Sequence, residues 1–361
     1  MRDRNLIVSG PGKLEIVEED VAPGPFRVRT LFSGVSAGTE LSFVKNTHPA
    51  LHTGFDTELG LFGGPGDDAF PVTRLGYMEV GVVTDSSTPA VAEGATVAMT
   101  YGHRTGWTGD PLRDRIVPLP ADLDPILGIY AAHMGPICAN GLLHAAADLN
   151  GTAVGGLGDG VAGRRVAVTG AGVVGLITAL FARAHGAASV VVVDPSPDRL
   201  AIAAALGLET LDSSEGDPAV TLKTRWRHWP GDRGADIVFQ CRGQDSALQL
   251  ALRLLRPQGT VIDLAFYQGG AGEVRLGEEF HHNGLHLVCA QIGRVPRGLG
   301  STWDRERLSA STVDLLRRDG DAIREHLITA VVPFDDAPAL LDDLAARRRQ
   351  EVQAVLSFDA P

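Results

Sequence analysis

A glycine turn in the middle of the chain has the clearest potential for chemistry. Gly170-Ala-Gly172-Val-Val-Gly175 has the spacing G-x-G-x-x-G, and it lies between the strand-like run RVAVT and the helical run Val173–His185. In such a turn the first glycine permits a tight bend, the second lets the backbone approach a pyrophosphate, and the third lets the helix pack on the strand. Free N–H groups at the helix start, those of Val173, Val174 and Gly175, then face the phosphate charge. The turn predicts a dinucleotide site.

The spacing alone is weak support, because the chain has 44 glycines among 361 residues. At that frequency roughly 0.6 matches arise by chance. A second match does occur at Gly158-Asp-Gly160-Val-Ala-Gly163. It follows no predicted strand and begins no predicted helix, so only the match at Gly170 has the context that the chemistry requires.

An acidic residue supports the dinucleotide interpretation. Asp194 ends the next strand-like run, 19 residues after Gly175. A carboxylate there accepts hydrogen bonds from both adenosine ribose hydroxyls and repels a 2′-phosphate, which favours NAD over NADP as the cofactor. Arg199, five residues further on, is a second candidate to flank the ribose. A helix-surface arginine is an equally good interpretation of Arg199.

The surrounding sequence predicts an α/β fold with a doubly wound parallel sheet. Continuous β-branched runs alternate with helical runs, the pattern of a parallel sheet that is covered on both faces. Strands are expected at 165–169, 189–193, 235–240, 260–263 and 285–289, and helices at 173–185, 197–206 and 245–255. The strand Leu285–Cys289 is apolar and would be an exposed sheet edge, so we expect it to pair in a homodimer.

The other parts of the chain have a different pattern. Short apolar runs cut by glycine and proline up to about Asp124 predict a β-rich half. Within it, Thr53–Pro71 is expected to be a loop over a site or a disordered insertion. Gly151–Gly163 has the composition of a linker. Towards the C-terminus we expect two helices, Asp304–Arg318 and Asp335–Arg347, and a last strand near 352–358.

Charge and composition disfavour nucleic acid and membranes as partners. The net charge of −12 disfavours nucleic acid and an anionic membrane surface, because both require a basic face. No window reaches the length of an apolar membrane span, and the N-terminus lacks an apolar signal segment. The three cysteines lie far apart and predict no disulfide framework. We expect a cytoplasmic protein with a small-molecule substrate.

The chain resembles the medium-chain dehydrogenase/reductase superfamily, whose best-known members are zinc alcohol dehydrogenases. The resemblance is carried by Ser33-Gly-Val-Ser-Ala-Gly-Thr-Glu40, Leu75-Gly-Tyr-Met-Glu-Val-Gly-Val-Val83, the nucleotide-binding half and Val332-Pro-Phe-Asp-Asp-Ala-Pro338. It implies a GroES-like β domain formed by 1–138 and 290–361, and a Rossmann domain at 139–289. The serine followed by Gly-Thr-Glu is similar to bacteriochlorophyllide dehydrogenases and to sugar or cyclitol dehydrogenases.

The chain departs from the zinc members at their metal ligands. Ser36 or Ala37 replaces the catalytic cysteine, Tyr77 and Met78 replace histidine and glutamate, and Gly135 or Pro136 replaces the third ligand. The four-cysteine structural zinc lobe is also missing, because 97–115 contains no cysteine. These residues cannot supply the N, S or carboxylate ligands that zinc needs. We therefore expect no metal, and we interpret Glu278-Glu-Phe-His-His282 as an exposed polar turn rather than a metal site.

Without zinc, a positioned side chain must handle the proton of an alcohol substrate. The resemblance places Thr39 at the relay hydroxyl, with Glu40 beside it as an orienting carboxylate, and Tyr77 at a vacated ligand position. His48, His52 and His103 lie on predicted loops and are further candidates. Each residue also has a purely structural interpretation: a turn bond for Thr39, packing for Tyr77, and solvation for each histidine.

The resemblance also implies that Asn140 and Gln291 contact the nicotinamide. The sequence thus favours a zinc-independent, NAD-dependent oxidoreductase that interconverts a secondary alcohol of the polyol, sugar or cyclitol type and its ketone. A quinone or enoyl reductase of the same superfamily is the first alternative, although Asp194 disfavours the NADPH that such enzymes prefer. The second alternative is a non-catalytic NAD-binding protein.

Overall fold

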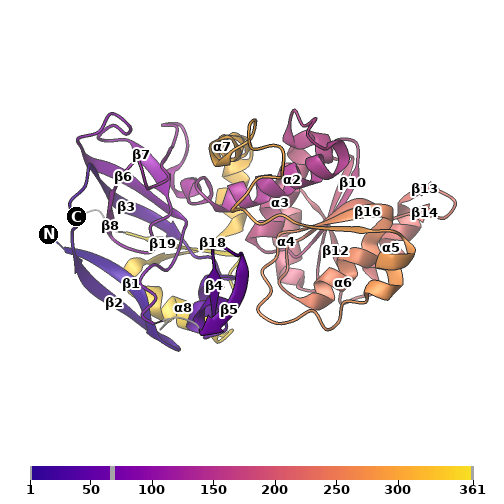
Figure 1. Cartoon of the computed structure of the whole chain (residues 1–361), viewed down its shortest axis with the longest axis horizontal. Helices are drawn as coiled ribbons and strands as arrows, with labels where there is room; N and C mark the ends of the chain where they lie inside the picture. Colours follow the sequence, from indigo (N-terminus) through magenta and orange to yellow (C-terminus); the bar gives the residue numbers. More distant parts are fainter. Residues whose placement is uncertain (1, 66–69, 359–361) are drawn as a thin grey trace. The chain divides into compact units, whose positions relative to one another are not determined.

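A computed structural model describes residues 2–65 and 70–358, which form two units (Figure 1). Unit 1 combines Met1–His133 with Ile328–Pro361, and unit 2 is the continuous segment Met134–Leu327. The predicted fold class is confirmed, since one unit is β-rich and the other has a parallel sheet.

Unit 2 has a six-stranded parallel sheet. Its strand order is β12-β11-β10-β15-β16-β17. The strands are β10 (Arg165–Thr169), β11 (Ser189–Asp194), β12 (Glu209–Asp212), β15 (Ala235–Gln240), β16 (Leu255–Asp263) and β17 (His286–Cys289). The helices are α2 (Met134–Asn150), α3 (Val173–Ala184), α4 (Pro197–Ala205), α5 (Pro218–Arg225), α6 (Asp245–Leu254) and α7 (Arg305–Ala322). A small hairpin, β13 (Arg227–Trp229) and β14 (Asp232–Arg233), and helical turns at Leu157–Gly160, Leu276–Phe280 and Ile323–Leu327 complete the unit.

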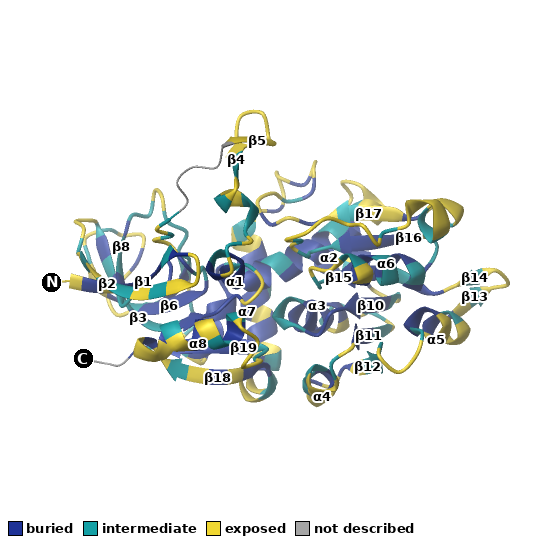
Figure 2. Ribbon diagram, turned by 90° about the horizontal axis from the view of Figure 1, so that it is seen from below, coloured by how far each residue is buried: buried dark blue, intermediate teal, exposed yellow. Residues whose placement is uncertain are grey.

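Both faces of this sheet are buried, as the continuous apolar runs predict. Ala167 and Val191 pack in one cluster with residues of α5 and α6. Their neighbours Val166, Val168 and Val192 are equally buried, and side chains alternate between the two faces along a strand. Figure 2 shows these strands in the buried colour. The sheet therefore holds the glycine turn between β10 and α3 on a rigid scaffold.

Unit 1 is a mixed β structure that both chain ends build. Its main sheet has the order β18-β19-β3-β6-β7-β9, and β8 also pairs with β3. The strands are β1 (Arg2–Gly10), β2 (Lys13–Asp20), β3 (Phe26–Gly34), β4 (Thr53–Asp56), β5 (Leu61–Pro65), β6 (Glu79–Ser86), β7 (Thr96–Met99), β8 (Gly106–Gly109), β9 (Val117–Pro118), β18 (Ile328–Pro333) and β19 (Gln353–Ser357). Its helices are α1 (Glu40–Val44) and α8 (Ala337–Ala345), with short turns at Pro49–Leu51, Pro125–Tyr130 and Phe334–Asp336. Leu6, Leu41 and Leu341 share one core cluster, so residues far apart in sequence stabilise this unit together.

Two expectations for irregular segments were wrong. The segment Thr53–Pro71 contains the antiparallel hairpin β4–β5, in which Phe55 lies opposite Phe62, while residues 66–69 of it lie outside the described residues. Both rings are exposed, and Figure 2 shows the hairpin in the exposed colour. The segment Gly151–Gly163 is not a loose linker either. Its residues Leu157 and Val161 are buried, and its helical turn packs against α2.

The chain returns to unit 1 later than expected. The resemblance implied a boundary at residue 290, but Ile328 is the first residue after unit 2. The reason is that α7 packs against α2 and α3 and therefore belongs to the nucleotide-binding unit.

The strand β17 lies at the edge of the six-stranded sheet, with Leu287 exposed. Pairing of this edge in a homodimer stays a prediction. Within residues 2–65 and 70–358, no helix is both long and apolar enough to cross a membrane.

Candidate active site

The glycine turn of unit 2 has the geometry that its spacing predicts. Gly172 caps the start of α3, and Gly170 has φ +104°, a conformation that side chains disfavour. A Cβ on Gly175 would lie 1.8 Å from the carbonyl oxygen of Gly170, so only glycine lets α3 approach β10 this closely. Around Gly172 there is open space, and the nearest side-chain atom to a Cβ there would be Nη1 of Arg199 at 4.0 Å. A guanidinium thus lies beside the open turn.

A cavity of about 510 Å³ lies at the carboxyl ends of the parallel strands. Residues that follow β10, β11, β12 and β15 line it, including Gly170, Pro195, Ser213 and Arg242. Parallel α/β sheets bind their ligands at this edge. The position and size of the cavity suit part of a dinucleotide.

Asp194 connects the end of β11 to the glycine turn. Its Oδ2 accepts a hydrogen bond from the N–H of Ala171 at 2.9 Å, and its Oδ1 accepts one from the N–H of Ser196 at 2.9 Å. The side chain is buried. Each carboxylate oxygen keeps a second lone pair for a ribose hydroxyl. Asp194 therefore holds the backbone at Ala171 and Ser196, in addition to its predicted role of binding the ribose hydroxyls.

Asn140 and Gln291 both form hydrogen bonds within or to the segment 290–294 of unit 2. The buried amide of Asn140 donates to the carbonyls of Ala290, Gln291 and Arg294 at 3.2–3.4 Å. Its Oδ1 has no hydrogen-bond partner among the described residues. Gln291 is exposed, and its Oε1 accepts from the N–H of Gly293 at 2.6 Å. In this structure Asn140 orders the segment 290–294, whereas the sequence assigned it to the nicotinamide directly.

In unit 1, Glu40 and His103 form a fully buried pair. Nε2 of His103 lies 2.8 Å from Oε2 of Glu40, and the side chains are 0% and 1% exposed. The other oxygen of Glu40 accepts a hydrogen bond from the N–H of Ser36 at 2.8 Å. Burial alone would lower the pKa of His103, but the charge and hydrogen bond of Glu40 and the charge of Glu79 outweigh burial and raise it. Glu40 and Glu79 therefore favour the protonated form of His103.

A second carboxylate continues this network. Nδ1 of His103 lies 2.6 Å from Oγ of Ser33, which donates to Oε1 of Glu79 at 3.0 Å. Glu79 also accepts the N–H groups of Met78 at 3.1 Å and Tyr101 at 2.7 Å. Burial raises the pKa of Glu79, and the charge of His103 acts in the opposite direction. Two carboxylates and one imidazole thus meet inside the β-rich unit.

Gly76 gives the network its space. Its φ is +100°, and a Cβ would lie 2.8 Å from Cε1 of His103. Any side chain at this position would therefore displace the imidazole ring.

Tyr77 presents its hydroxyl beside this network. Its Oη and Oγ of Ser36 form a hydrogen bond, and its ring contacts the ring of His133 edge-on, with centroids 4.7 Å apart. Burial raises the pKa of Tyr77 to about 12. Hydrogen bonds from Ser36 and Thr39 act against this rise, and the charges of Glu40 and Glu79 add to it. At neutral pH the phenol is therefore a hydrogen-bond donor. The structure thus brings Thr39, Glu40, Tyr77 and His103 together, and their catalytic roles stay predictions.

The other candidate histidines have structural contacts. His48 begins the turn Pro49–Leu51, where its Nδ1 accepts from the N–H of Ala50, and its ring stacks on Phe43 at 4.0 Å. His52 bonds to the carbonyl of Asn46 at 2.8 Å. These contacts join each histidine to residues of its own segment, Phe43, Asn46 and Ala50. They involve no residue of the Tyr77 network. His48 therefore caps a turn in this structure.

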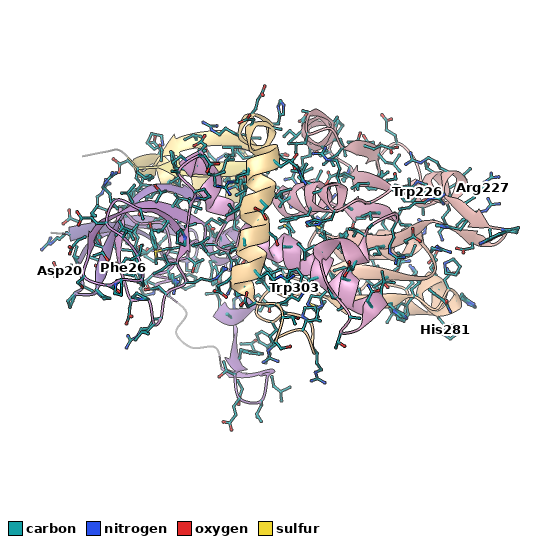
Figure 3. The ribbon with its side chains drawn as sticks, turned by 90° about the horizontal axis from the view of Figure 1, so that it is seen from above. Asp20, Phe26, Trp226, Arg227, His281 and Trp303 are labelled. Atoms are coloured by element: carbon teal, nitrogen blue, oxygen red, sulfur yellow. The ribbon has the colours of Figure 1, made fainter. Side chains whose placement is uncertain are left out.

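The described residues include no group of three or more His, Cys, Asp or Glu side chains that could hold a metal ion. His281 and His282 are exposed, and Figure 3 shows His281 at the periphery of unit 2. Gly135 is one of the two candidates, with Pro136, for the third ligand position of zinc members, and a Cβ on Gly135 would lie 2.1 Å from Cγ2 of Thr312 in α7. A cysteine or carboxylate side chain has no room there without a shift of α7.

Several proteins that are similar to this chain are named as dehydrogenases. A sequence model of the family "Zinc-binding dehydrogenase" matches residues 173–295. D-guloside 3-dehydrogenase of Escherichia coli (strain K12) is 28% identical over 350 residues, which cover 93% of this chain and 94% of that protein. Sorbitol dehydrogenase 1 of Saccharomyces cerevisiae is 36% identical over 201 residues, 54% of this chain and 51% of that protein. The crystal structure of galactitol-1-phosphate dehydrogenase from Escherichia coli has the same fold, with a TM-score of 0.74, 16% identity, and coverage of 98% of this chain and 99% of that one.

These findings define a dehydrogenase with a β-rich unit and a doubly wound nucleotide-binding unit. The chain is similar to dehydrogenases of the medium-chain dehydrogenase/reductase superfamily.

Sequence reasoning missed Ser33 and Glu79. Both lie in runs that were interpreted as strands or as family motifs, and a buried strand gave no reason to expect chemistry. The signal was a single acidic residue inside the apolar run from Leu75 to Val83. A carboxylate in such a run is either at a boundary or paired in the core, and Glu79 is paired.

The buried pair leads to a stability prediction. Glu40→Ala removes the carboxylate and leaves the imidazolium of His103 and the N–H of Ser36 without a partner. Breaking one side of a buried ion pair costs about 3–5 kcal/mol. Chemical denaturation at pH 7 should show this loss in the free energy of unfolding.

The control is Glu209→Ala, which removes the exposed carboxylate paired with Arg225. Exposed pairs contribute about 0–1 kcal/mol. If both variants lost about the same small amount of unfolding free energy, the result would show that Glu40 and His103 are not paired in solution.

Proposed function

We propose that this dehydrogenase is NAD-dependent and zinc-independent, and that it interconverts a secondary alcohol of the polyol, sugar or cyclitol type and its ketone. The observation that carries the proposal is the hydroxyl pair of Tyr77 and Ser36. The resemblance matches Tyr77, and either Ser36 or Ala37, with positions where zinc members have metal ligands. The named relatives that act on D-gulosides and sorbitol support the substrate class.

The donor set does not fit zinc. Ser36 and Tyr77 offer neutral hydroxyls that bond to each other, and Gly135 offers no donor. Catalytic zinc sites use three ligands from Cys, His and carboxylates. The proposed chemistry therefore has no step that involves zinc.

Unit 2 fits a dinucleotide. Gly170 and Gly172 leave the turn open, the N–H groups of Val173 and Val174 begin α3, and Arg199 supplies a nearby positive charge for the pyrophosphate or ribose. Asp194 would accept the ribose hydroxyls, and its charge disfavours the 2′-phosphate of NADP. Bound NAD supplies the acceptor or donor of the hydride.

Unit 1 supplies the groups that act on the reacting oxygen. Because Tyr77 is a neutral phenol at pH 7, its Oη donates a hydrogen bond to the substrate oxygen and delivers a proton to it during ketone reduction. Ser36 and Thr39 orient this phenol through their hydroxyls. Glu40 holds the N–H of Ser36 and so fixes the turn that carries both.

The direct test is a screen of polyols, sugars and cyclitols with NAD and NADP, before and after treatment with a chelator. We expect oxidation with NAD that survives chelation, and elemental analysis should find substoichiometric zinc. Stoichiometric zinc, or activity that chelation abolishes and zinc restores, would contradict the proposal.

Asp194→Ala tests the cofactor choice. The loss of charge-assisted hydrogen bonds costs about 1.5–3 kcal/mol, which raises the dissociation constant of NAD roughly 10- to 150-fold. The preference for NAD over NADP should narrow at the same time. Fluorescence titration with NADH and NADPH measures both quantities.

Asp198→Ala is the matched control, because Asp198 is an exposed carboxylate on the first turn of α4. An unchanged ratio of NADH to NADPH affinity in Asp194→Ala would show that Asp194 serves only the internal hydrogen bonds to Ala171 and Ser196.

Tyr77→Phe tests the proton donor. Removing the phenolic hydroxyl should lower kcat by about 10²–10⁴, the range of a lost general acid. NAD affinity should remain, because Tyr77 is not part of the glycine turn. Thr39→Val should reduce turnover as well, and the double variant should lose less than the product of the two losses, because the residues act as one unit.

Tyr101→Phe is the control, since Tyr101 is a buried tyrosine whose hydroxyl bonds to Thr30 outside this group. Full activity in Tyr77→Phe would assign Tyr77 to packing.

A further inference from the structure

Ser33 connects His103 and Glu79, and none of the three is exposed. All three side chains have 0% relative exposure, and the two contacts of the serine hydroxyl are 2.6 and 3.0 Å. At that burial, hydrogens within the group have to satisfy both contacts.

With a hydrogen on Nε2 of His103, counting the hydrogens leaves two arrangements around Ser33. The serine hydroxyl has a single hydrogen to donate. In the first arrangement Nδ1–H of His103 donates to Ser33, and Ser33 donates to a Glu79 carboxylate. In the second, Glu79 is a carboxylic acid that donates to Ser33, and Ser33 donates to an unprotonated Nδ1. The shift of two hydrogens converts one arrangement into the other, and the number of protons does not change.

Both arrangements treat Glu40 alike. In both, Nε2–H of His103 is the donor to Oε2 of Glu40, and Oε1 of Glu40 accepts the N–H of Ser36. The cluster of Glu40, His103 and Glu79 therefore carries one negative charge in either arrangement. Arg104, which pairs with Glu19 at 3.2 Å, and the phenols of Tyr77 and Tyr101 also interact with these carboxylates.

We propose that Glu79 is a positioning residue for the chemistry of Tyr77: through Ser33 it shares one proton with His103, and this proton keeps Glu40 as the carboxylate that holds the turn of Ser36 and Thr39. Its role in turnover rests on the proposed function, whereas the shared proton does not.

The consequence for Tyr77 follows from charge. Glu40 and Glu79 both disfavour a phenolate at Tyr77, so the cluster keeps the phenol protonated and able to donate. Neutralising Glu79 removes part of this effect. It also removes one of the two anions that stabilise the imidazolium of His103.

Side-chain nitrogen NMR of His103 tests the shared proton without any substrate. In the unmodified protein Nδ1 should remain protonated or in exchange with a proton from pH 6 to well above pH 7. In Glu79→Gln, which keeps the shape of the side chain, Nδ1 should lose its proton at a pH lower by about 1 unit or more. An unchanged titration of His103 would overturn the proposal.

Ser33→Ala provides a second variant in case Glu79→Gln does not fold. Without the hydroxyl the two groups lose their bridge, so His103 should again titrate at lower pH. Thr30→Val is the matched control, because it removes another buried hydroxyl from β3 that bonds to Tyr101 and Arg104 instead. A shift of the same size in Thr30→Val would show that general disruption of β3 is the cause, and would also overturn the proposal.

The pH profile of ketone reduction tests the positioning role. Glu79→Gln should move the alkaline limb of kcat/KM to lower pH by about 1 unit, with the plateau lowered by a smaller factor than in Tyr77→Phe. If kcat/KM fell by the same factor at every pH and the alkaline limb did not shift, the role of Glu79 would be only structural. If no alcohol or ketone reacts but the NMR shifts occur, the shared proton stands and the proposed function fails.

Discussion

The buried contact between His103 and Glu40 is the constraint on which the β-rich unit depends. A charge inside a protein must be paired and fully hydrogen-bonded, because its transfer from water is otherwise too costly. This requirement brings together α1, the end of β3, the start of β6 and the segment after β7. Gly76 has to be a glycine because the imidazole ring occupies the space of a side chain. The position of Tyr77 is a consequence, since it lies between Gly76 and the strand of Glu79.

In the nucleotide-binding unit, too, a buried carboxylate orders the local backbone. Asp194 ends β11, and its oxygens bind the backbone on both sides, at Ala171 and Ser196. The glycine turn is therefore fixed by a neighbouring strand before any ligand binds, and its N–H groups need not reorganise. Preorganised donors of this kind lower the cost of binding an anion. In both units a buried carboxylate orders a glycine-containing turn.

The sequence predicted regular parts of the fold well and irregular parts poorly. The strand of 235–240 and the helix from Val173 were predicted because burial on both faces leaves a strong apolar signal. The helix α2 was not predicted, since its Gly135-Pro136 start and small residues resemble a loop. Thr39, Glu40 and Tyr77 came from motif positions. His103 was one of several loop histidines, and Glu79 was not considered, because their pairing depends on contacts between distant segments.

Charge also constrains how a reaction at Tyr77 could proceed under the proposed function. A metal ion would stabilise an alkoxide through positive charge. Here the groups beside the phenol carry one net negative charge, which makes an alkoxide at the same place unfavourable. The hydrogen bonds of Tyr77 and Ser36 are neutral and offset this only in part. In ketone reduction the phenol of Tyr77 therefore has to deliver its proton as the hydride arrives, and solvent has to restore that proton afterwards. In alcohol oxidation the phenolate form of Tyr77 has to accept the proton of the alcohol as the hydride leaves, rather than before it.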